Sequence, residues 1–184
     1  VQVLQMKNPS GQLSEIEEQA LRCSRIVKEL LKFSPSKERP LGSDRDTWGP
    51  VPVAAVLDDV CGLLRGPFAA TGIEIIETVR SESEVHGDAE ALSAALIQLL
   101  NSLRSACRGS GRLDITSTDH PRQVHIDCTL TGDSIDGQSD DWKAAGMGFW
   151  LARKVFADHG GELIEPNLAP GARSGTWTIR IPLV

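Results

Sequence analysis

The sequence contains no tyrosine and only 4% aromatic residues, so no tyrosine side chain is available as a catalytic acid or base. It also contains no apolar run that approaches the roughly 18–20 residues of a membrane-spanning helix, and no signal peptide opens the chain. These absences predict a cytoplasmic protein that meets a membrane only through segments outside this chain.

The cysteines are too widely spaced to form a zinc-binding pair, because no CxxC motif joins any two of them. They are interpreted as reduced thiols, mostly packed in the interior of a cytosolic protein. We therefore expect no metal site built from them. The four residues are Cys23, Cys61, Cys107 and Cys128.

Acidic residues outnumber basic ones, with 25 Asp and Glu against 19 Lys and Arg. The net charge of −6 argues against a protein that wraps a nucleic-acid backbone, so no nucleic-acid partner is expected. Hydrophobic residues make up 40% of the chain and charged residues 24%, the balance of a soluble globular protein. The 184 residues leave room for one full domain and one appendage.

Common catalytic motifs are missing too. The sequence has no GxxxxGK[ST] phosphate loop, no GxSxG elbow and no HExxH zinc motif. The four histidines, His86, His120, His125 and His159, stand alone, and no catalytic residue is predicted. The Gly146-Met147-Gly148 turn is compatible with simple helix capping, and also with an anion site at a helix start.

Residues 1–34 predict helices with a single apolar stripe, whose members recur at helical spacing from Leu13 to Leu31. The stripe either packs on the chain's own domain or belongs to a helical hairpin that pairs with a second copy. The second interpretation is favoured, because the short first helix cannot cover a stripe of this length. A homodimer through residues 1–34, as a four-helix bundle, is therefore expected.

Residues 35–50 contain three prolines and are predicted to be a linker that leads to a domain at 51–184. Residues 131–145 are polar and contain glycine, which predicts a loop. The element order favours helices layered on one face of a mixed sheet. Periodicity predicts helices at 52–70, 90–106 and 148–159, and strands at 73–79, 112–117, 123–130, 161–165 and 175–184.

Several segments resemble sensor histidine kinases. GMGFWLARKVFADHGGEL at 146–163 is similar to the family's glycine box and the helix that follows it, and SGTWTIRIP at 174–182 to its last strand pair. RCSRIVKELLKFS at 22–34 looks like the second helix of the dimerisation hairpin. The resemblance implies an α+β fold, a two-layer α/β sandwich of the GHKL type shared with Hsp90, preceded by a truncated helical hairpin.

Two boxes depart from the family pattern. In the register of the asparagine box, Gln98 and Ser102 replace both asparagines, and Asn101 points about 100° away on a helix. Ser102 thus replaces the residue that is a magnesium ligand in the family. In the next box, Leu130 replaces the aspartate that would accept a hydrogen bond from the adenine amino group. By resemblance, the nucleotide-pocket positions are Gln98, Ser102, Leu130, Gly132, Gly146, Gly148, Gly175 and Thr176.

Two functions follow from this resemblance. The favoured hypothesis is a histidine-kinase core of two-component signalling that is deficient in ATP binding, needs no cofactor, and acts as a dimeric regulatory or phosphotransfer scaffold. The alternative is an active ATP-dependent kinase core, which would use ATP with Mg²⁺ and lacks its phosphoacceptor helix in this chain. Either hypothesis implies a response-regulator receiver domain as the partner.

Overall fold

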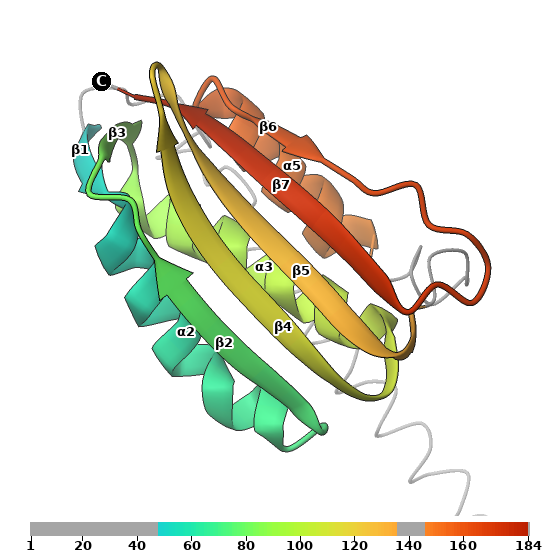
Figure 1. Ribbon diagram of the computed structural model, residues 1–184. Coiled ribbons are helices and arrows are strands. Elements are labelled where there is room, and N and C mark those ends of the chain that lie inside the picture. The colour runs from blue at the N-terminus through green and yellow to red at the C-terminus, as the bar shows by residue number, and fades with distance from the viewer. Residues whose placement is uncertain (1–47, 136–145, 184) are drawn as a thin grey trace, which may run out of the picture. The chain divides into compact units, whose positions relative to one another are not determined.

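The structure is a computed structural model that describes residues 48–135 and 146–183 (Figure 1). The predicted hairpin at 1–34 and most of the predicted linker lie outside these residues. The elements, in chain order, are β1 (Gly49–Pro52), α2 (Val53–Ala69), β2 (Ile73–Val79), β3 (Glu84–Gly87), α3 (Ala89–Ala106), β4 (Cys107–His120), β5 (Gln123–Ile135), α5 (Gly146–Asp158), β6 (Glu162–Ile164) and β7 (Ser174–Pro182).

Strands of the described part form two sheets. The larger sheet has five strands in the order β2-β4-β5-β7-β6, and the smaller pairs β1 with β3. In the larger sheet β2 runs parallel to β4, whereas β4, β5, β7 and β6 pair antiparallel. The helices α2, α3 and α5 cover one face of the larger sheet (Figure 1). The predicted two-layer sandwich, with its helices on one face, is confirmed.

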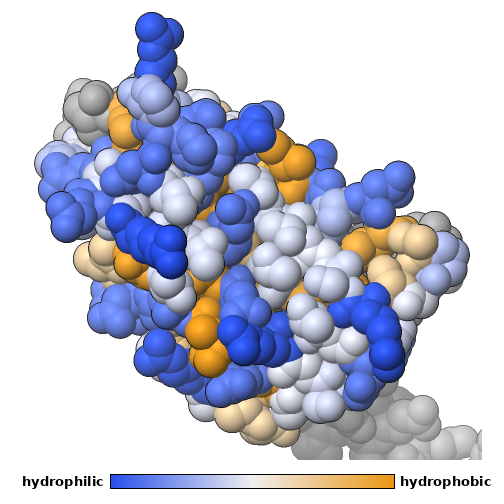
Figure 2. All heavy atoms as spheres, viewed as in Figure 1, coloured by the Kyte–Doolittle hydropathy of each residue, from blue (hydrophilic) through white to orange (hydrophobic). Residues whose placement is uncertain are grey.

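Strict alternation in the central strand explains why only one face of the sheet is covered. Val124, Ile126, Cys128 and Leu130 of β5 are all buried, and the residues between them are partly exposed. Because successive side chains of a strand point to opposite faces, these four form one apolar row beneath the helices. Figure 2 shows that the other face is mostly polar, with apolar side chains in small separate areas.

Helix α3 lies at the centre of the helical layer. Its side-chain cap is Asp88, whose carboxylate accepts hydrogen bonds from the Glu90 and Ala91 amides at 2.9 and 3.1 Å. One stripe of α3 is buried, as the spacing predicted, and α3 packs against both α5 and α2. No helix in the described part of the chain is long and apolar enough to cross a membrane.

Two of the described cysteines, Cys61 and Cys128, are buried free thiols, which confirms the prediction for this pair. Burial, with a smaller effect from the Glu77 carboxylate, raises the pKa of the Cys61 thiol to about 12. Burial also raises the pKa of the Cys128 thiol. Both side chains therefore stay protonated and act as small apolar groups in the core.

The predicted loop at 131–145 is wrong for its first five residues, because β5 continues to Ile135. This extension pairs with the start of β4, with a bulge between Arg108 and Gly111. Strands β1 and β3 were not predicted, and β1 includes the last two residues of the predicted linker. Each has only four residues, too few to show a clear alternation.

Candidate functional site

The site predicted from the sequence lies where the start of α5 approaches the middle of α3. A Cβ atom placed on Gly148 would lie 2.8 Å from Gln98 Oε1 and 3.4 Å from Ser102 Oγ. Glycine therefore permits this close approach of the two helices. Positions 98 and 102 are therefore adjacent to Gly148.

The Ser102 hydroxyl is directed into its own helix. It donates a hydrogen bond to the Gln98 carbonyl oxygen at 2.8 Å, and the residue is only 4% exposed. A serine at this position is therefore short, buried and already hydrogen-bonded. Its hydroxyl oxygen lies near Gly148 but extends less far from the helix than an asparagine amide would.

Leu130 belongs to the hydrophobic core, on the helix-facing side of β5. It is fully buried, and it pairs with Leu113 of β4 and Gly175 of β7 in the sheet register. An apolar side chain on this helix-facing row cannot accept a hydrogen bond. The structure thus places a core leucine where the resemblance predicts a carboxylate.

The connection between β6 and β7 occupies the space beside Leu130. A Cβ atom on Gly175 would lie 2.7 Å from Leu168 Cδ2 and 3.2 Å from Pro166 Cγ. Leu168 packs against the hydrophobic core. The helix-facing side of β7 is therefore filled by apolar atoms at its start. Sequence reasoning missed Leu168, which has no periodic signal in a segment that contains two prolines.

Two of the predicted positions do not join this region. Gly132 lies opposite Gly111 in the sheet, and a Cβ atom on it would lie 2.7 Å from Cys107 Sγ, so it accommodates the first residue of β4. Thr176 lies on the open face of the sheet, where its hydroxyl is 2.9 Å from the Thr129 hydroxyl. Its prediction as a pocket residue is corrected here, because alternation turns Gly175, rather than Thr176, toward the helices.

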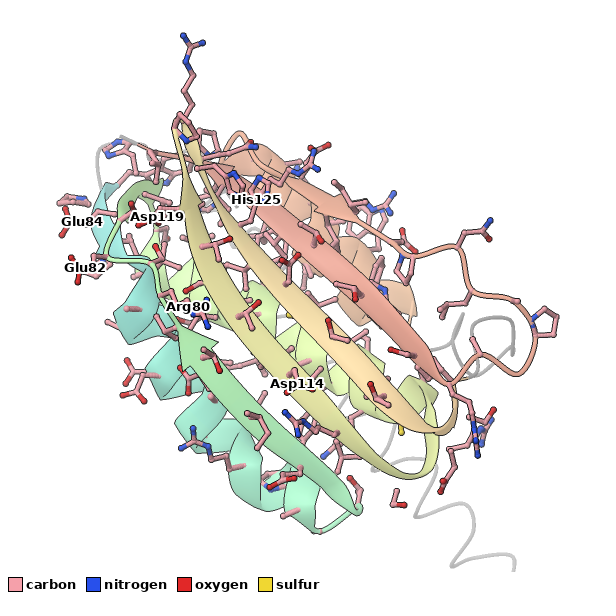
Figure 3. All side chains as sticks on the ribbon, viewed as in Figure 1. Arg80, Glu82, Glu84, Asp114, Asp119 and His125 are labelled. Carbon is pink, nitrogen blue, oxygen red and sulfur yellow. The ribbon has the colours of Figure 1, made fainter. Side chains whose placement is uncertain are left out.

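Polar clusters elsewhere on the domain have structural partners. Figure 3 shows Arg80, Glu82, Glu84 and Asp119 gathered near one end of the sheet. Asp119 accepts hydrogen bonds from the Ser81 hydroxyl at 2.5 Å and the Glu82 amide at 3.3 Å, and these bonds lower the pKa of its carboxyl. This carboxylate therefore holds the turn between β2 and β3. Among the described residues, no three metal-ligating side chains gather into a group that could hold an ion.

This arrangement is the fold of histidine-kinase catalytic domains. No protein-family model matches the sequence, and no curated protein matches it. Among solved structures, Acinetobacter baumannii histidine kinase AdeS is similar over 97% of this chain and 87% of its own, with a TM-score of 0.67 and 15% identity. Mycobacterial sensor histidine kinase MprB is similar over 73% of this chain and 97% of its own, with a TM-score of 0.60 and 21% identity.

A third similar structure is a complex. Histidine kinase ThkA, solved together with the response regulator protein TrrA, is similar over 100% of this chain and 53% of its own, with a TM-score of 0.67 and 18% identity. At these identities the comparisons establish the shared fold. The chemistry of the site has to be argued from the residues of this chain.

Proposed function

We propose that this chain is a histidine-kinase core of two-component signalling whose nucleotide site no longer binds ATP, and that it acts as a dimeric regulatory or phosphotransfer scaffold. The fold and the sequence resemblance support the kinase core. One observation supports the proposed loss of ATP binding: the side chain at position 130 is a leucine that is fully buried in the core.

The energetic argument concerns the adenine amino group. A hydrogen bond to a carboxylate inside a pocket contributes roughly 1.5–3 kcal/mol, so its loss lowers affinity about 10- to 100-fold. The Leu130 methyl groups accept no hydrogen bond, and Leu168 and Pro166 fill the adjacent space over Gly175. An adenine beside Leu130 would lose hydration of its amino group without compensation.

The contribution of Mg²⁺ to ATP binding is expected to be reduced as well. Magnesium in a nucleotide site takes one or two protein oxygens and keeps several waters. Ser102 is 4% exposed, and its hydroxyl stays close to its own helix through the hydrogen bond to the Gln98 carbonyl, so this short side chain reaches less far toward a metal ion than an asparagine amide would. Phosphate contacts to the backbone at the glycine turn remain possible in this proposal, since they need no side chain.

We expect ATP with Mg²⁺ to bind with a dissociation constant above about 1 mM, because the losses in binding free energy at positions 130 and 102 add together. Isothermal titration calorimetry of the full chain at neutral pH measures it. In a matched thermal-shift experiment, 1 mM ATP should stabilise the folded chain by at most about 0.4 kcal/mol. The control is the Gly148→Val variant, whose side chain would meet Gln98 and Ser102 at the turn. Low-micromolar binding that Gly148→Val removes would contradict the proposal.

That contrary result would support the alternative, an active ATP-dependent kinase core. One observation favours it: the glycine at position 148 and the polar residues at positions 98 and 102 still meet. In that case Gln98, whose amide oxygen faces Gly148, would be the residue that replaces the lost asparagine contacts. A Gln98→Ala variant would then lose ATP affinity, whereas in the favoured proposal it changes nothing measurable.

The dimer is part of the same proposal. We expect light scattering of the full chain at high micromolar concentration to report a dimer, because four helices can bury apolar stripes that two cannot. The matched control is the chain without residues 1–34, which should be a monomer. A monomeric full chain, unchanged by this truncation, would exclude dimerisation through residues 1–34.

A receiver domain of a response regulator is the proposed partner, supported by the fold shared with ThkA.

A further inference from the structure

Two histidines from neighbouring strands meet on the open face of the larger sheet. His120 is the last residue of β4 and is exposed, and His125 lies near the start of β5 and is partly exposed. Their imidazole rings stack, with centroids 3.8 Å apart and planes 30° apart. In the sheet register His120 pairs with Gln123 and His125 with Thr118, so the two histidines are diagonal neighbours on one face. Figure 3 shows His125 near the end of the sheet where β4 connects to β5.

One ring nitrogen of His125 carries a lone pair rather than a proton. Its Nε2 atom lies 2.7 Å from the side-chain nitrogen of Gln123, which can only donate a hydrogen bond. Burial lowers the pKa of His125, and the neighbouring His120 and Arg180 lower it further. Near neutral pH His125 is therefore the uncharged imidazole, which is the form that binds a transition-metal ion.

Charged groups around the pair have partners of their own. Arg180 lies opposite His125 on β7, and its Nη1 atom donates a hydrogen bond to the Glu162 carboxylate at 3.0 Å. The negative charge of Glu162 offsets the guanidinium, and Asp127 adds a second negative charge on the same face, where it accepts a hydrogen bond from the Thr178 hydroxyl at 2.5 Å. The charges beside the two imidazoles are therefore compatible with a bound cation.

The other two histidines form no such pair. His86 and His159 both contact the Trp48 indole, with ring centroids 6.0 and 4.5 Å from it. The Nδ1 atom of His159 lies 2.7 Å from the Val155 carbonyl oxygen, and its Nε2 atom accepts a hydrogen bond from the Asp88 backbone N–H at 3.0 Å. Both ring nitrogens of this buried histidine are thus engaged, and His86 alone offers only one ligand.

We propose that His120 and His125 form a two-imidazole site for a divalent transition-metal ion, of the class of Ni²⁺, Cu²⁺ and Zn²⁺, with water at the remaining coordination positions. Imidazole nitrogen suits these ions, whereas Mg²⁺ and Ca²⁺ select oxygen ligands. The site lies on the face of the sheet opposite the helices, so the proposal does not depend on nucleotide binding.

The stacked arrangement favours chelation over binding by one ring. Once one imidazole holds the ion, the second is already beside it, so its binding is intramolecular and occurs at a high effective concentration. Coordination by Nε2 of His125 displaces the Gln123 amide, which gives up one hydrogen bond at a surface where water replaces it. Gln123 is therefore a competitor of the ion.

Calorimetric titration of the full chain with Ni²⁺ at neutral pH tests the site. We expect a dissociation constant of about 0.1 mM or lower. His120→Gln and His125→Gln should each weaken binding by about tenfold or more, because either variant leaves a single imidazole. The matched control is His86→Gln, which removes an exposed histidine outside the pair and should leave the affinity unchanged. Gln123→Ala should bind at least as tightly as the unmodified chain, because the competing amide is gone.

Nuclear magnetic resonance of the unmodified chain locates the ion without any variant. Paramagnetic Ni²⁺ broadens the signals of nearby amides, so those of residues 118–125 should weaken first, and those of α2 and His86 should persist. The proposal is overturned if the chain does not bind Ni²⁺, if only one of the two histidine variants weakens binding, or if neither does. Broadening centred on any other part of the chain would overturn it as well.

Discussion

The Leu130→Asp variant is expected to lose about 4 kcal/mol of folding free energy or more at pH 7. Leu130 is fully buried in the apolar row of β5. Replacing a buried leucine by a small residue costs roughly 2–5 kcal/mol through lost transfer energy and cavity formation. An unpaired carboxylate at the same place adds the penalty of a buried charge. Thermal or chemical denaturation of the two chains measures the difference.

The loss should depend on pH in a defined direction. Burial raises the pKa of the introduced carboxyl above its unfolded value of about 3.9, so the folded variant binds more protons than the unfolded one. Its stability is therefore highest at low pH and decreases as the pH rises through the folded pKa. We expect a larger difference from the unmodified chain at pH 8 than at pH 5.

The matched control is Thr131→Asp, one residue further along β5 and exposed on the other face. A surface substitution of this kind changes stability by about 0.5 kcal/mol or less. Equal losses for the two variants would contradict the position of Leu130 in the core.

The same substitution also tests why the nucleotide site is deficient. Combined with Ser102→Asn, Leu130→Asp restores the carboxylate and one amide of the family pattern. If the two replaced residues cause the deficiency, millimolar ATP with Mg²⁺ should return part of the lost stability, since a ligand that binds only the folded state stabilises it. The unmodified chain should gain almost nothing under the same conditions. No gain in either chain would show that other features, such as Leu168 beside Gly175, also close the site.

The Trp177→Ala variant should lose about 3–5 kcal/mol, a large share of the stability of a domain of this size. Trp177 is 1% exposed and has one of the largest fully buried side chains in the core. Its ring also lies beside the site, because a Cβ atom on Gly175 would be 3.3 Å from Trp177 Cη2. Denaturation curves measure the loss.

Trp150→Ala is the control for this second substitution, because Trp150 is 60% exposed at the start of α5. Its loss should be within about 0.5 kcal/mol. Similar losses for the two tryptophans would mean that Trp177 does not fill the core as described.

Local patterns in the sequence were sufficient to predict the longer helices and strands. Helices α2, α3 and α5 and strands β2, β4, β5, β6 and β7 all overlap predicted segments, since each carries a period that its buried face imposes. The grouping of positions 98, 102 and 148 came from the family resemblance rather than from a local pattern, and in the structure a Cβ atom on Gly148 would lie 2.8 Å from Gln98 Oε1.

The tertiary structure decided the features that depend on residues far apart in the chain. The strand state of 131–135 depends on pairing with β4, and the four-residue strands β1 and β3 stabilise each other. Gly175 and Thr176 were both predicted as pocket positions, but only Gly175 faces the helices, because one step along a strand reverses the face. The contacts of Leu168 with Gly175 and of Trp48 with His159 have no local signal. Such contacts arise only when the folded chain brings distant residues together, and packing then determines which side chains fill the remaining space.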